Sequence, residues 1–179
     1  MVYFPSYSYM EKVVEAFAQK YPDVPVLVQR RGMTQEQKEQ FLDAFRADNP
    51  QMLIGFCVLG GSFSEGVDLP GGRLIGSIIV GVGIPGLSDE RNIIRDYYAD
   101  VNGMGYEYAY VYPGMNAVLQ AAGRVIRTDT DRGVVVLLDQ RYAEQRYIDL
   151  FPPHWEDVRF ASDAQSLAKI IASFWKNGQ

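Results

Sequence analysis

The stretch LIGSIIVGV, residues 74–82, places apolar side chains on both faces of an extended chain. A strand that is apolar on both faces is typical of a parallel sheet covered by helices on each side. Residues 52–59, MLIGFCVL, form a second continuous apolar stretch. The two stretches predict two buried strands of an α/β domain.

Strand and helix signals alternate on both sides of these two strands. Further strands are predicted at residues 2–4, 24–28 and 133–138, and helices at residues 6–20, 88–99, 116–127 and 164–175. Thr34 to Gln37 should cap one more helix, and Ser8 and Glu11 should form a capping box in the first one. The alternation predicts a doubly wound α/β fold with a mostly parallel sheet and helices on both faces.

Length and composition agree with one folded domain. The chain has 179 residues, which suffice for one domain and leave too little for two. Hydrophobic residues make up 47% and charged residues 22%, so the composition excludes a disordered chain. The chain opens with a predicted strand at residues 2–4, from which we expect that it is a piece of a longer protein.

The charge balance and the cysteine content limit the partners. Seventeen Lys and Arg against 22 Asp and Glu give a net charge of -5, so nucleic acid can be contacted only by a few placed groups. The single cysteine, Cys57, and the single histidine, His154, predict neither a disulfide nor a metal site. Without a targeting signal or a long apolar segment, we expect a cytoplasmic protein with no membrane partner.

Gly81, Gly83 and Gly86 match the spacing of a dinucleotide-binding fingerprint. That fingerprint also requires a second strand that ends in an acidic residue about 20 residues later. Residues 95–100 have a helical pattern instead, and Pro85 favours a loop. We therefore predict a glycine- and proline-rich loop, followed by a helix that Ser88 or Asp89 caps.

A phosphate-binding P-loop is missing from the sequence. Such a loop needs a Gly-Lys-Ser/Thr step, because the lysine neutralises the phosphates and the hydroxyl holds Mg²⁺. None of the lysines follows a glycine or precedes a serine or threonine. The chain on its own is therefore predicted not to hydrolyse ATP.

Residues 116–132, NAVLQAAGRVIRTDTDR, carry the strongest functional signal. A helical projection groups one set of residues in a narrow arc: Asn116, Gln120, Gly123, Arg124 and Arg127. The opposite side is apolar: Val118, Leu119, Ala122, Val125 and Ile126. The planar guanidinium group of arginine can bind two phosphate oxygens, so this face suits a phosphate. Solvent-exposed arginines that pair with nearby aspartates would give the same pattern.

Three segments resemble helicase motifs, in the same order. QAAGRVIR, residues 120–127, which continues as TDTDRG to residue 133, resembles motif VI of superfamily 2 helicases in its DinG and XPD form. FPSYSYMEKV, residues 4–13, resembles motif IV of that branch, and residues 60–85 resemble its motif V. The resemblance implies the second RecA-like motor domain of an ATP-dependent 5′ to 3′ DNA helicase, spanning residues 1–179.

The same resemblance implies a partner domain that this sequence does not contain. In the family, a first motor domain carries the Walker A lysine, the DEAH box and, in many members, an iron–sulfur cluster. ATP and Mg²⁺ would be shared with that N-terminal motor domain, in the cleft between the two. Any iron–sulfur cluster would belong to the missing part.

The resemblance also assigns residues to the nucleotide. Gln120, Arg124 and Arg127 would face the γ-phosphate, with Arg124 or Arg127 as the arginine finger. The residues implied to bind or sense the nucleotide are Glu65, Gly66, Asp68 and Gly123. The alternative for Glu65 and Asp68 is a capped tight turn.

Single-stranded DNA is the other implied partner. Its backbone would be contacted by Ser6, Tyr7 and Ser8 of motif IV and by Ser62 and Ser64 of motif V, although ordinary helix capping also explains the first serines. A different function remains open, namely a stand-alone RecA-like module that binds nucleic acid or protein without ATPase activity. The pairing of Gln120 with two arginines favours the helicase.

Overall fold

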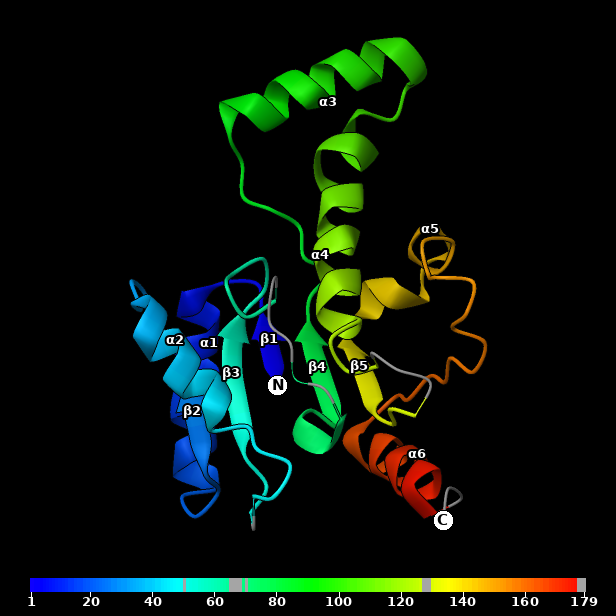
Figure 1. The fold of residues 1–179 in the computed structure, drawn as a ribbon. Helices are drawn as coiled ribbons and strands as arrows, with labels where there is room; N and C mark the ends of the chain where they lie inside the picture. Colours follow the sequence, from blue (N-terminus) through cyan, green and yellow to red (C-terminus); the bar gives the residue numbers. More distant parts are fainter. Residues whose placement is uncertain (50, 65–68, 70, 127–129, 177–179) are drawn as a thin grey trace.

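The described residues form a five-stranded sheet in the order β2-β3-β1-β4-β5, in which all pairings are parallel (Figure 1). The strands are β1 (Val2–Phe4), β2 (Val26–Val28), β3 (Ile54–Val58), β4 (Gly76–Val80) and β5 (Val134–Leu138). This computed structural model describes residues 1–49, 51–64, 69, 71–126 and 130–176. The predicted α/β class is confirmed.

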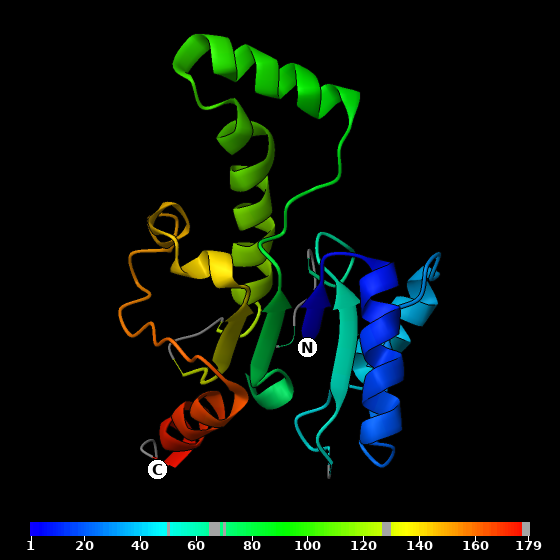
Figure 2. The same ribbon diagram turned by 180° about the vertical axis from the view of Figure 1, so that it is seen from behind.

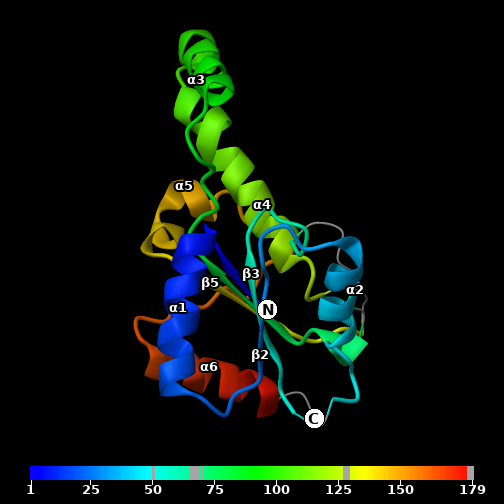
Figure 3. The ribbon, with the colours of Figure 1, turned by 90° about the vertical axis from the view of Figure 1, so that its left-hand side faces the viewer.

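Helices cover both faces of this sheet. The helices of the described residues are α1 (Tyr7–Lys20), α2 (Gln35–Asp43), α3 (Asp89–Asn102), α4 (Tyr112–Ala122), α5 (Gln145–Ile148) and α6 (Ala164–Lys176). Figure 3 shows α1 and α6 on one side of the strands and α2 and the lower end of α4 on the other. The doubly wound arrangement predicted from the alternation is therefore present.

Alternate strand residues supply two separate core layers. Tyr3, Cys57 and Ile79 are fully buried on the face covered by α2 and α4. Phe4 and Phe56 are buried on the face covered by α1, where their rings stack. Burying one such apolar side chain contributes about 1.5 to 3 kcal/mol, so both layers stabilise the sheet.

The two predicted helix caps have different outcomes. Thr34 and Gln37 form the expected capping box, each side chain accepting from the backbone N–H of the other. The capping box predicted at Ser8 and Glu11 is wrong. The N-cap is Ser6 instead, whose backbone is extended and whose hydroxyl accepts from Tyr9 N at 3.3 Å. Since α1 starts two residues earlier than that box requires, Ser8 already lies in its first turn.

The helix predicted at residues 116–127 ends earlier, at Ala122. The N–H groups of Arg124 and Val125 bond three residues back, to Ala121 and Ala122, so the chain tightens into turns after α4. Val125 still enters the core, but Ile126 is 48% exposed. The single arc predicted for the polar residues of motif VI is therefore not one helical face.

A helical arm stands out from one end of the sheet. It consists of α3, the π-helical turn Glu107–Val111 (η2) and the start of α4, which project together in Figures 1 and 2. Arg91 of α3 donates to the carbonyl of Ala109 at 2.7 Å, and the rings of Tyr98 and Tyr108 stack at 3.9 Å. These contacts hold the two sides of the arm together.

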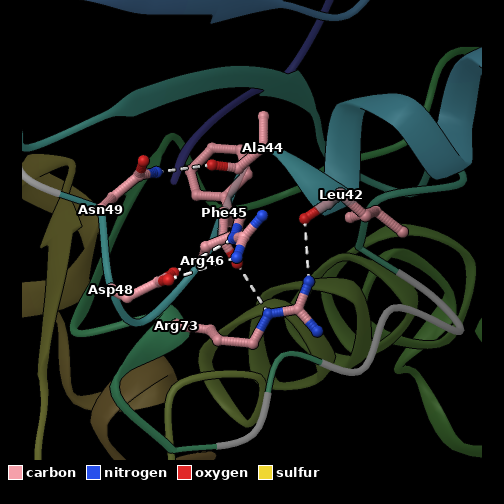
Figure 4. A network of polar contacts seen from close by, with 7 residues as sticks. All are labelled: Leu42, Ala44, Phe45, Arg46, Asp48, Asn49 and Arg73. Carbon is pink, nitrogen blue, oxygen red and sulfur yellow. Dashed lines mark hydrogen bonds and ion pairs between the residues drawn. The ribbon is translucent and has the colours of Figure 1, made fainter.

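The C-terminal end of α2 is tied to the segment that precedes β4. Arg73, in the short 3-10 turn Gly71–Arg73 (η1), donates to the carbonyls of Phe45 and Leu42 at 2.6 and 2.9 Å (Figure 4). Asn49 donates to the carbonyl of Ala44 at 2.7 Å. Carbonyls at a helix end lack intrahelical donors, so these side chains satisfy them.

The loop after β4 packs against α4 through one glycine of the spacing that resembles a dinucleotide fingerprint. Gly83 has a φ of +68°, and a Cβ there would overlap the carbonyl oxygen of Gly114 in α4. A Cβ on Gly114 would lie 2.7 Å from the carbonyl oxygen of Val82. The glycines thus allow close packing of a loop on a helix, and the next helix starts at Asp89 with Ser88 as its cap, as predicted.

Gly83→Ala should lower the free energy of unfolding by about 2 to 5 kcal/mol, because it combines a left-handed backbone with a steric overlap. Gly86→Ala is the matched control in the same loop, since a Cβ there meets nothing within 4 Å. Chemical denaturation of the two variants measures the difference. Equal stability of the two would contradict the packing described for Gly83.

Candidate nucleotide and nucleic-acid site

The loop that follows β3 is held by side chains from distant segments. The Tyr3 hydroxyl of β1 donates to the carbonyl of Phe63 at 3.1 Å, and Arg124 Nε donates to the carbonyl of Ser64 at 3.3 Å. Within the loop, Ser64 N and Oγ both donate to the carbonyl of Gly61, at 3.0 and 2.9 Å. The segments that resemble motifs V and VI are therefore in direct contact.

Arg124 is half-buried just beyond the end of α4. Its charge acts on Tyr3: burial raises the pKa of this phenol, and the nearby guanidinium opposes that shift. The hydrogen bond to the Ser64 carbonyl ties the guanidinium to the motif V loop. Arg124 thus reaches this loop from the turns after α4, and not from a continuous helix.

The other predicted nucleotide-binding residues divide into two groups. Gln120, in the last turn of α4, and Gly123, its C-cap, are both exposed near Arg124 in the sequence. The remaining residues lie outside the described residues: Glu65, Gly66, Asp68 and Arg127. Arg124 is the predicted catalytic residue that the structure connects to motif V.

The predicted DNA-binding residues of motif IV lie at the start of α1. Ser6 is the N-cap, and its hydroxyl lies 3.2 Å from that of the exposed Ser8. Tyr7 is partly buried, and its hydroxyl accepts from Gln29 at 3.0 Å. Hydroxyls and N–H groups at a helix N-terminus suit a phosphate, and capping by Ser6 is compatible with such a contact.

The two serines of the motif V loop differ in accessibility. Ser62 is exposed, whereas Ser64 has no exposed surface. The Ser64 hydroxyl donates to the Gly61 carbonyl, and the Ser64 carbonyl accepts from Arg124. The DNA contact predicted for Ser64 therefore does not fit its buried position. Ser64 instead holds the loop in shape.

Two residues beside this site were missed by the sequence analysis. The Arg31 guanidinium lies over the ring of Tyr7, 4.3 Å from its centre. Gln29 is buried, with 6% exposure, and bonds both Tyr7 and the backbone N–H of Val58. Their only signal is their place in the loop that follows β2, since loops at the ends of parallel strands carry functional groups.

Neither a metal site nor a membrane span is found in the described ranges. Residues 1–49, 51–64, 69, 71–126 and 130–176 contain no cluster of three or more His, Cys, Asp or Glu side chains that would suit a metal ion. Over the same part of the chain, no helix has the length and apolar character to cross a bilayer. Burial raises the pKa of Cys57 to about 12, which leaves it an unreactive core residue.

Similar proteins include helicases from distant organisms. The chain is 32% identical over 161 residues to a regulator of telomere elongation helicase 1 homolog of Drosophila persimilis, covering 80% of this chain and 16% of that protein. It is also 32% identical over 169 residues to the ATP-dependent DNA helicase DinG of Photobacterium profundum, covering 90% of this chain and 24% of that protein. The chain thus spans less than a quarter of either relative.

Solved structures of XPD have a similar fold. An XPD helicase structure is 27% identical, with a TM-score of 0.63, and covers 83% of this chain and 26% of its own. An apo XPD structure is 24% identical, with a TM-score of 0.65, and covers 83% of this chain and 29% of its own. The fold is therefore the RecA-like fold that the motif resemblance implied.

The family described as the helicase C-terminal domain matches residues 1–158, which include all three motif segments and the five strands. This match confirms the motif resemblance over most of the chain. The chain belongs to the family of helicase C-terminal domains, in the branch that contains the DinG and XPD helicases.

Proposed function

We propose that this chain is the second motor domain of an ATP-dependent 5′ to 3′ DNA helicase. The observation that carries the proposal is the hydrogen bond from Arg124 to the Ser64 carbonyl, which joins motif VI to motif V. Arg124 is a charged side chain that is held by the motif V loop. Such an arginine suits a domain that completes the active site of a neighbouring domain. The family membership and the relatives named above support the same function.

In this proposal, the chain contributes a positively charged arginine to the active site for ATP hydrolysis. Phosphoryl transfer spreads negative charge over the transferred group, and an arginine finger that meets this charge raises the rate by about 10³ to 10⁵. Arg124 or Arg127 supplies the finger, and Gln120 contacts the γ-phosphate. The residues proposed to bind or sense the nucleotide are Glu65, Gly66, Asp68 and Gly123.

ATP and Mg²⁺ are held mainly by a first motor domain in this proposal. The sequence lacks the Gly-Lys-Ser/Thr step that cradles phosphates, and the described residues contain no metal-binding cluster. Any iron–sulfur cluster would also belong outside this chain, since Cys57 is its only cysteine and is buried. The protein would work in the reducing cytoplasm.

Single-stranded DNA follows the start of α1 and the exposed part of the motif V loop. Ser6, Tyr7, Ser8 and Ser62 supply hydroxyl groups for the phosphates. Arg31 adds a positive charge beside Tyr7, which supports a backbone contact in a chain that is acidic overall.

A binding module without ATPase activity is the second candidate. It is favoured by the exposed apolar stripe on α3, where Ile93, Tyr97 and Val101 are 69%, 60% and 59% exposed. These residues recur every four positions and therefore lie along one helix face. Such a stripe suits a protein partner. A complete protein that does not hydrolyse ATP would favour this candidate.

Arg124→Ala in the full-length protein should lower kcat for ATP hydrolysis by about 10³-fold or more if Arg124 is the finger. Arg127→Ala, assayed in parallel, identifies which arginine meets the phosphate, because the finger gives the larger loss. Arg46→Ala is the control, since Arg46 forms an ion pair with Asp48 at the surface. Less than a tenfold loss in both Arg124 and Arg127 variants would contradict the proposed role of motif VI.

Binding of single-stranded DNA to the chain should be weak and salt-dependent. Each phosphate contact contributes about 0.7 to the slope of log K against log salt for single strands. Arg31→Ala should therefore reduce the slope by roughly that amount, whereas Arg46→Ala should leave it unchanged. Fluorescence anisotropy at several salt concentrations measures both, and tight binding that salt does not weaken would contradict the DNA path.

A further inference from the structure

Gln29 uses both ends of a buried amide to join two structural elements. Its Oε1 accepts from the backbone N–H of Val58 at 2.8 Å, and its Nε2 donates to the hydroxyl of Tyr7 at 3.0 Å. The residue follows β2 directly and is 6% exposed. It therefore connects the end of β3 to the first turn of α1.

The bond to Val58 replaces a bond of the sheet. The β2 and β3 ladder continues through Gln29 N, which donates to the carbonyl of Phe56 at 2.9 Å. In a parallel pair, the next bond would run from Val58 N to a backbone carbonyl of the neighbouring strand. The Gln29 side chain accepts this bond instead, so the end of β3 is held by a side chain.

The turn of motif V packs against the same amide. A Cβ on Gly61 would lie 3.1 Å from the Val58 carbonyl oxygen and 3.3 Å from Gln29 Nε2. Gly61 in turn accepts both hydrogen bonds of Ser64, whose carbonyl accepts from Arg124. The contacts run without interruption from Tyr7 to Arg124.

The two ends of this chain of contacts are the two partner sites of the proposed function. Tyr7 lies under the Arg31 guanidinium, where a DNA phosphate would be met. Arg124 is the residue proposed to act on the nucleotide. Gln29 itself is buried between them and contacts neither partner.

We propose that Gln29 is a positioning residue that transmits DNA contact at Tyr7 to the motif V loop and hence to Arg124. DNA that fixes Tyr7 also fixes the Gln29 amide, the end of β3 and the turn at Gly61. The inference rests on the proposed function, because it assigns a route between the two sites of that function.

The test compares ATP hydrolysis with and without single-stranded DNA in the full-length protein. Gln29→Met keeps the size of the side chain but removes both hydrogen bonds, and Tyr7→Phe removes only the hydroxyl. Each change should reduce the DNA-stimulated increase in kcat by about fivefold or more, the lower end of usual coupling between sites. The double variant should lose no more than either single one, because both break the same connection.

Gln145→Met is the matched control, since Gln145 is an exposed glutamine at the start of α5 whose side chain donates to the Asp149 carboxylate. It should keep both the rate measured without DNA and the full stimulation. Stimulation that survives in both Gln29→Met and Tyr7→Phe would overturn the inference. Losses that multiply in the double variant would overturn it too.

Hydrogen exchange at the Val58 amide separates this inference from the proposed function. Gln29→Met should speed exchange at Val58, whereas Tyr7→Phe should not, because only the first removes the acceptor of that N–H. Unchanged exchange in Gln29→Met would overturn the contact itself. A full-length wild type that DNA never stimulates would instead overturn the proposed function, and the coupling role with it, while the exchange result still reports on the contact.

Discussion

The site depends on how the chain leaves the end of β3. Beyond Val58, the backbone has no neighbouring strand to bond on the β2 side, and buried polar groups without partners are costly. Gln29, Tyr3 and Arg124 supply the missing partners from three other segments. The loop shape is therefore decided by side chains that are far from it in the sequence.

The residues of this loop differ in exposure. Ser64 and Phe63 face inward and are held, while Ser62 remains exposed. Arg124 serves the same loop from the turns after α4, so a shift of the loop moves a guanidinium. A domain built in this way suits the donation of charge to a nucleotide bound elsewhere better than the holding of that nucleotide alone.

Much of the fold could be predicted because the apolar pattern of each strand is a local property. The strands at residues 74–82 and 52–59 were recognised from their two apolar faces, and the motif VI segment from its arginines. The end of α4 at Ala122 was missed, because the helical pattern continues past Gly123 while Val125 must turn into the core. Gln29 and Arg31 were missed because one polar residue after a strand has no distinctive pattern, and their roles come from contacts with Tyr7 and Val58.

The most direct test of the account is a side-by-side measurement of ATP hydrolysis by the chain of residues 1–179 and by the full-length protein, both with single-stranded DNA. We predict no ATP turnover by the chain alone and DNA-stimulated turnover by the full-length protein. In the proposed function, the arginines of motif VI lie on this chain, whereas the loop that binds the phosphates lies on the first motor domain. Turnover by the isolated chain at the full-length rate would contradict it. Absence of turnover in the full-length protein would contradict the motor function itself.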